Sequence, residues 1–304
     1  MSARIALPTL IVAVLTALTL VPPAAAGPWG LARGEWYANL EAGTFTANSF
    51  HPADGGRADS GLIVEERAIR TLVEVGWKKR ASLVFGLPVM SVTRRDARVQ
   101  GTATGFQDVL VGVRYNLKNG ASAAAVEIDW NGPSGYNRHL DTLGIRLGDG
   151  LQELSAQLQL GTAIGKRGFV EGSIGYGYRY LSIGKREKGP FVAGDPHPGK
   201  FQWADRLHAT ADVGIWLGRS VLAGGRYRGL MTLSNGVLMP ETDVHLAGAV
   251  LLYRLDDRLD MFAGSWSTAR GKNTLHFDQV YLGFAFHRTK LNRLQGFLGG
   301  SQAP

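Results

Sequence analysis

The residues best placed to do chemistry are ionisable side chains that alternate with apolar neighbours. Arg226 and Arg228 stand two residues apart, and His208 and Asp212 keep the same rhythm in an earlier segment. Residues two apart in an extended chain point to the same side, so each segment would gather its charges on one face. If that face is enclosed, its charges can pair into a structural network or select solutes by the sign of their charge. Both interpretations stay open from the sequence.

The candidate interior residues all share this alternating position. They are Glu41, Arg70, Glu74, Asp108, Arg114, Glu127, Glu153, Glu171, Arg179, Arg206, His208, Asp212, Arg226 and Arg228. Small residues occupy the same face at Gly112, Ala123, Ala125, Gly161, Gly175, Gly177 and Gly283, where they would ease the curvature of a sheet or leave clearance for a solute.

Other polar residues form no recognised metal-binding pattern. His51, Asp54 and Asp59 lie close together, as do Asp195 and His197, but neither spacing matches a known metal site. Both groups lie among glycine or proline residues typical of turns. We therefore predict no metal and no cofactor.

The tripeptide that begins at Ser234, Ser-Asn-Gly, is a candidate for a hydrolytic nucleophile. Such a serine needs a general base within hydrogen-bond reach. The outer-membrane phospholipase motif has a histidine two residues before its serine, and Thr232 stands there in this chain. Ser-Asn-Gly is also typical of a turn, so we predict that the chain is not an enzyme.

The N-terminus has the pattern of an export signal. Arg4 precedes an apolar run over 5–20, and three alanines at 24–26 give a small-residue cleavage pattern before Gly27. A retained membrane anchor is the alternative, which the prolines at 22–23 disfavour. We predict a signal peptide over residues 1–26.

The composition after the signal favours a membrane barrel over a soluble domain. The chain has 41 glycines and no cysteine, and its apolar residues are spread evenly rather than in a second run of about 18 residues. Barrel strands have this composition because half of their residues face lipid and half a polar interior. The net charge of +8 points to lipid phosphate or anionic solutes rather than nucleic acid, because no nucleic-acid-binding motif is present.

Alternation with period two predicts twelve strands. We place them at 34–47, 62–78, 81–94, 105–117, 121–131, 150–164, 168–183, 202–217, 220–233, 241–255, 258–269 and 276–287. The expected fold is therefore all-β: a transmembrane antiparallel up-and-down β-barrel of about 12 strands over residues 27–287, followed by a periplasmic C-terminal tail at 288–304.

The connections between these strands alternate in length. Tight hairpins are expected near 78–80, 118–120, 165–168, 218–219 and 256–257, and longer loops near 48–61, 95–104, 132–149, 184–201, 234–240 and 270–275. Short periplasmic turns and longer outer loops are typical of outer-membrane barrels. An even strand number also brings both chain ends to the short-turn side.

The segment from Gly105 to Leu117, GFQDVLVGVRYNL, resembles the outer-membrane barrels of the phenol meta-pathway. LVFGLPVMS at 83–91 resembles the strand before it in that family, and AVEIDW at 125–130 resembles the strand after it. Gln107 departs from the family's usual glycine. The resemblance implies a twelve-stranded barrel that moves hydrophobic or aromatic compounds, without catalytic residues.

The predicted function is therefore an outer-membrane channel or transporter for small molecules, hydrophobic or aromatic ones among them. The second alternative is a closed structural or interaction barrel that acts through its outer loops. The third is a lipid-modifying enzyme. The expected location is the outer membrane of a Gram-negative bacterium, and the expected partners are membrane lipid, lipopolysaccharide, a small solute and the barrel-assembly machinery. Val280, Leu282, Phe284 and Phe286 would offer that machinery an apolar terminal strand.

Overall fold

The computed structural model describes residues 31–95, 100–134, 152–165, 167–180, 205–233 and 242–288, and their regular structure is all strand. The strands are β1 (Trp36–His51), β2 (Ala58–Lys78), β3 (Ala81–Arg95), β4 (Gln100–Phe106), β5 (Val109–Lys118), β6 (Ser122–Gly132), β7 (Gln152–Ile164), β8 (Gly168–Tyr180), β9 (Arg206–Trp216), β10 (Val221–Thr232), β11 (Asp243–Arg254), β12 (Leu259–Lys272) and β13 (Thr274–Arg288). Within these ranges no helix has the length and hydropathy needed to span a membrane.

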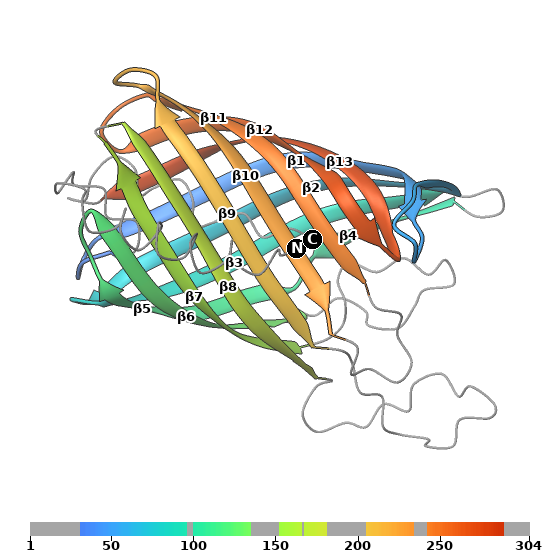
Figure 1. Cartoon of the computed structure of the whole chain (residues 1–304), viewed down its shortest axis with the longest axis horizontal. Helices are drawn as coiled ribbons and strands as arrows, with labels where there is room; N and C mark the ends of the chain where they lie inside the picture. Colours follow the sequence, from blue (N-terminus) through green and yellow to red (C-terminus); the bar gives the residue numbers. More distant parts are fainter. Residues whose placement is uncertain are drawn as a thin grey trace, which may run out of the picture.

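These strands close into one antiparallel barrel. Apart from β4 and β5, which both pair with β3, each strand pairs with its neighbours in the chain. β1 also pairs with β13, so that Trp36 lies opposite Arg288. Figure 1 shows the first strands, in blue, beside the last, in red. Closure leaves no sheet edge, and this satisfies the backbone hydrogen bonds that a bilayer cannot.

The barrel wall has twelve strand positions, as the sequence predicts, although thirteen strands occur among the described residues. We call each of these twelve positions in the wall a stave. Both β4 and β5 pair with β3, β4 along Val89–Arg95 and β5 along Ala81–Gly86. They form one stave that is interrupted at Gln107 and Asp108. The extra strand thus occupies the end of the expected loop at 95–104, where the alternation is too weak to indicate pairing.

The tight hairpins expected from the sequence are confirmed, and they gather at one end of the barrel. We call this the turn end; it carries the connections at 79–80, 119–121, 165–167, 217–220 and 255–258, and β1 begins and β13 ends there. The opposite end, the loop end, carries the described connections at 52–57 and 273.

One loop-end prediction is wrong. The loop expected at 270–275 is a turn of a single residue, Asn273, whose φ of 51° is left-handed. Asparagine tolerates this conformation better than most residues, so β12 and β13 run on almost to the barrel rim. The expected loops at 184–201 and 234–240, residues 135–149 of the loop expected at 132–149, the signal peptide at 1–26 and the tail beyond 288 lie outside the described residues.

Side chains alternate between the barrel wall's two faces. Ile69, Ile128 and Leu282 point outward and are 51%, 52% and 56% exposed, whereas their neighbours Arg70 and Glu127 are buried. An apolar exterior around a polar interior is the pattern that a lipid-embedded barrel requires.

Apolar packing fills the interior beside the closing strands. Phe45 on β1 contacts Phe277 on β13 edge to face, with ring centroids 4.9 Å apart, and Phe262, Trp266 and Tyr281 extend the same cluster. Edge-to-face pairs of this kind add to the stabilisation that burial provides.

Candidate functional site

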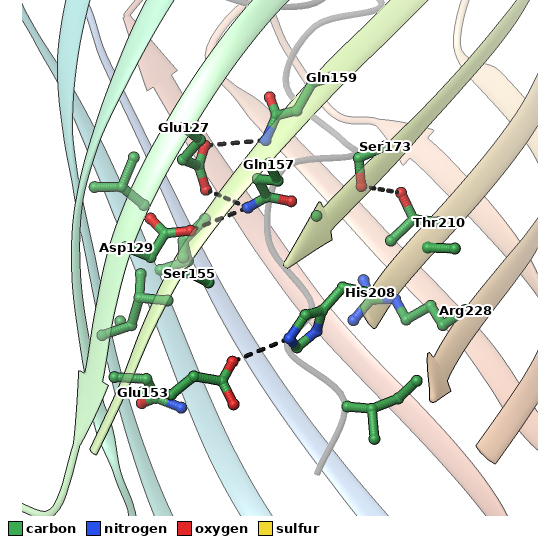
Figure 2. A pocket seen from close by; sticks show the side chains of 18 of the residues that line it. Glu127, Asp129, Glu153, Ser155, Gln157, Gln159, Ser173, His208, Thr210 and Arg228 are labelled. Carbon is green, nitrogen blue, oxygen red and sulfur yellow. Dashed lines mark hydrogen bonds and ion pairs between the residues drawn. The ribbon is translucent and has the colours of Figure 1, made fainter. Parts of the chain in front are cut away.

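Another part of the interior holds a cavity of about 340 Å³, lined by charged, polar and apolar side chains. Its walls come from residues of β2, β3 and β5–β11, together with Gln107 and Asp108 at the interrupted stave. Figure 2 shows Glu127 and Asp129 on one side of this cavity and His208 and Arg228 on the other. The cavity thus has an acidic wall on β6 and a basic wall on β9 and β10.

Arg114 on β5 holds the acidic wall together. Its Nη1 donates to Oε2 of Glu74 at 2.6 Å, and its Nε donates to Glu127 on β6. Glu127 also accepts from the amides of Gln157 and Gln159 on β7, at 3.0 and 3.1 Å. Arg114 is only 3% exposed. The two carboxylates therefore share one cation and are hydrogen-bonded, as buried charges must be.

A second buried arginine ties the first two strands. Nη2 of Arg70 lies 2.6 Å from Oε1 of Glu66, and its Nη1 lies 3.5 Å from Oε1 of Glu41. Arg70 also lines the cavity, where its contact with two carboxylates leaves little positive charge to offer a solute.

Glu153 on β7 gathers basic groups toward the loop end. Its Oε2 lies 3.8 Å from Arg179 Nε and 3.8 Å from Arg206 Nη1, and its Oε1 lies 3.0 Å from His208 Nε2. Glu153 and His208 reach each other across β8 because Gly177 has no side chain. A Cβ there would lie 2.6 Å from Glu153 Oε1 and 2.9 Å from His208 Nε2.

Other interior glycines also make room for neighbouring side chains. A Cβ on Gly112 would lie 2.0 Å from Oδ1 of Asp129, and one on Gly283 would lie 2.5 Å from Cζ of Phe262. The sequence suggested curvature or clearance for a solute, and contacts between side chains are a third reason.

Arg226 and Arg228 differ sharply although both project inward from β10. Arg226 lies opposite Asp212, donates to it at 2.9 Å, and donates to the hydroxyl of Tyr281 at 3.3 Å. Both guanidinium groups lie 5.0 Å from the Trp266 ring centroid. Arg228 lines the cavity and, among the described residues, has no carboxylate within 4.0 Å.

The structure thus places each candidate residue in the barrel interior, in several separate groups. Arg70, Asp108, Arg114, Glu127, Glu153, Glu171, Arg206, His208, Asp212 and Arg228 line the cavity, whereas Glu41, Glu74, Arg179 and Arg226 pair with lining residues.

Sequence reasoning missed several cavity residues that share the same alternation. Asp129 is two residues from Glu127, and Thr210 lies between His208 and Asp212 in the same phase. Period two would have found both, had uncharged and neighbouring polar positions been followed along each strand.

A further group, at the turn end, was also missed. Arg254 Nε donates to Oδ1 of Asp260 at 3.0 Å, His287 Nε2 lies 3.3 Å from Oδ2 of the same carboxylate, and the guanidinium lies 4.7 Å from the Trp216 ring centroid.

Of the loop residues for which the sequence predicts no metal site, His51, Asp54 and Asp59 lie in the described ranges. His51 Nε2 lies 3.1 Å from His276 Nδ1, but no group of three or more His, Cys, Asp or Glu side chains in the described ranges could hold a metal. His245 shares a hydrogen bond of 2.7 Å with Tyr227 on the outer face. Asp195, His197 and Ser234 lie outside the described residues.

Comparison with solved structures identifies the fold. The chain is similar to an outer-membrane channel from Pseudomonas putida F1, with a TM-score of 0.65 and 14% identity over 88% of this chain and 100% of that one. The fold is that of an outer-membrane β-barrel. The β-domain of the Bordetella autotransporter BrkA is similar over 84% of this chain and 100% of that one, with a TM-score of 0.51 and 13% identity. No protein-family model matches the chain, and no curated protein matches it by sequence.

Proposed function

We propose that this protein is a passive outer-membrane channel for small molecules. The observation that carries the proposal is the cavity of about 340 Å³ inside a closed barrel, whose lining places acidic groups on β6 across from basic groups on β9 and β10. Charged groups that line a narrow passage select solutes by charge and by hydrogen bonding. The fold shared with the Pseudomonas putida channel supports the same function.

We further propose that the protein is related to the barrels of the phenol meta-pathway, and that the solutes it passes are hydrophobic or aromatic compounds. The segment at 105–117 supports it by resemblance, and it forms the interrupted stave beside the cavity. The apolar residues Leu110, Leu230, Val244 and Leu246 in the cavity wall would accommodate an aromatic body.

The proposed lipid and protein partners follow from the residues on the barrel's outer face. Exposed apolar side chains would contact lipid and lipopolysaccharide, with the turn end in the periplasm. Val280, Leu282 and Phe286 point outward along β13, where the barrel-assembly machinery would recognise them.

The test is single-channel conductance of the full chain in planar lipid bilayers, with a matched pair of variants on β7. Ser155 lines the cavity, and its neighbour Ala156 is exposed on the outer face. S155W should lower conductance because indole fills the cavity, whereas A156W should leave it unchanged because its ring lies in lipid. Absence of conductance and of solute flux in the wild type would overturn the proposal.

A closed structural barrel is the second candidate, and the dense ion pairing around Arg114 and Arg70 favours it. It predicts no conductance in the wild type or in S155W. Its function would survive interior substitutions and be lost when outer loops are removed.

A further inference from the structure

Among the described residues, Arg228 has no carboxylate within ion-pair distance, 4.0 Å. Its cross-strand partners are Thr210 on β9 and Leu246 on β11. Arg226, the preceding inward-facing residue of β10, lies opposite Asp212 instead. A guanidinium that is partly removed from water is costly unless it finds an anion or hydrogen-bond acceptors. The Trp266 ring, 5.0 Å away, holds the group in place without cancelling its charge.

Hydroxyl groups lie on β8 and β9, and Thr210 is the cross-strand partner of Arg228 on β9. The hydroxyl oxygens of Thr210 and Ser173 are 2.8 Å apart, and either can donate to the other. Whichever donates, the other hydroxyl keeps its own proton for a third partner. Figure 2 shows this pair and Arg228 on the same side of the cavity. The wall therefore offers a charged donor and a neutral one together.

Apolar side chains adjoin the same donors. Leu246 lies directly opposite Arg228, and Val244 lies opposite Leu230, which is the next inward residue along β10. Leu230, Val244 and Leu246 all line the cavity. A ligand that fits this wall carries one negative group and an uncharged apolar body.

We infer that Arg228, with the Thr210–Ser173 hydroxyl pair, binds the carboxylate of a small organic acid whose apolar body rests on Leu230, Val244 and Leu246. This inference rests on the proposed channel function and gives it a substrate class: apolar monocarboxylates. Hydrogen bonds between a guanidinium and a carboxylate are charge-assisted and stronger than neutral ones, so the acid is preferred over its neutral analogues.

The test compares 4-fluorobenzoate with 4-fluorobenzamide, which has the same ring and no charge. In planar bilayers the benzoate should reduce the channel current, and the benzamide should not at equal concentration. In detergent micelles, fluorine NMR lines of the benzoate should broaden with the full chain and not with empty micelles. R228Q should weaken both effects about tenfold or more, as expected when one charge-assisted contact is lost.

Two further variants separate charge from folding. R219Q removes the same charge from the exposed β9–β10 turn, outside the cavity, and should leave both readouts unchanged. T210V keeps Arg228 and removes one hydroxyl, so it should weaken benzoate binding by a few-fold. If R228Q does not fold, T210V and the wild-type preference for acid over amide still decide the matter.

The outcomes for the site and for the channel are distinct. Conductance without benzoate block or line broadening would overturn the carboxylate site and leave the channel. Equal binding of acid and amide, or binding that R228Q does not change, would overturn it as well. Line broadening that depends on Arg228 without any conductance would support the site and overturn the proposed channel.

Discussion

Arg114 is the residue whose loss should cost the barrel most stability. It is 3% exposed, and its guanidinium is shared between Glu74 on β2 and Glu127 on β6. R114M keeps most of the apolar stem and removes the charge, which leaves two buried carboxylates without their cation. Breaking a buried ion pair on one side costs about 3–5 kcal/mol, because the remaining charge cannot be solvated. We expect R114M to lower the free energy of unfolding by about that amount.

The measurement is urea unfolding in detergent micelles, followed by tryptophan fluorescence. The triple variant R114M/E74Q/E127Q removes all the charges and should regain most of the lost stability, because neutral amides are cheaper to bury. R219M, in the exposed β9–β10 turn, should change the unfolding free energy by less than about 0.5 kcal/mol. A loss under about 1 kcal/mol for R114M, or a triple variant no more stable than R114M, would refute the reasoning.

Three other substitutions test separate parts of the barrel. G177V should destabilise it by about 1–3 kcal/mol in the same urea assay and separate Glu153 from His208, because its Cβ would lie 2.6 Å from the Glu153 oxygen; an unchanged midpoint would count against that contact. Replacing Asn273 (φ 51°) by glycine should leave stability unchanged or raise it, whereas valine should cost about 1 kcal/mol or more, and equal midpoints would contradict the left-handed turn. L282R should cost about 2–4 kcal/mol in lipid vesicles if that side chain faces the bilayer centre, and no loss relative to L282A would exclude a lipid-facing position.

Period two predicted most of the barrel because it reports a local property, the face to which each side chain points. The twelve staves and the turn-end hairpins follow from it. Alternation with period two did not predict the interruption at Gln107 and Asp108. The reason is that β4 pairs with β3 through alternating small and polar residues, which give little apolar signal. The turn at Asn273 was missed because a loop was inferred from polar composition, and one residue in a left-handed conformation was sufficient.

The pairing of interior charges could not be predicted from the sequence, because partners are set by register between strands. Arg114 reaches Glu74, forty positions earlier in the chain. Arg226 and Arg228 look equivalent along β10, and only their positions opposite Asp212 and Thr210 separate a neutralised arginine from an available one.

The aromatic packing beside β1, β12 and β13 and the cavity occupy different parts of the barrel. Phe45, Phe277 and their neighbours pack together where the chain's first and last strands pair. None of the described cavity-lining residues belongs to β1, β12 or β13. Substitutions that retune the cavity therefore fall on strands that do not close the ring. The lining of the cavity can therefore change while the packing that closes the ring stays the same, which makes β6–β10 the strands to diversify when a differently lined cavity is wanted.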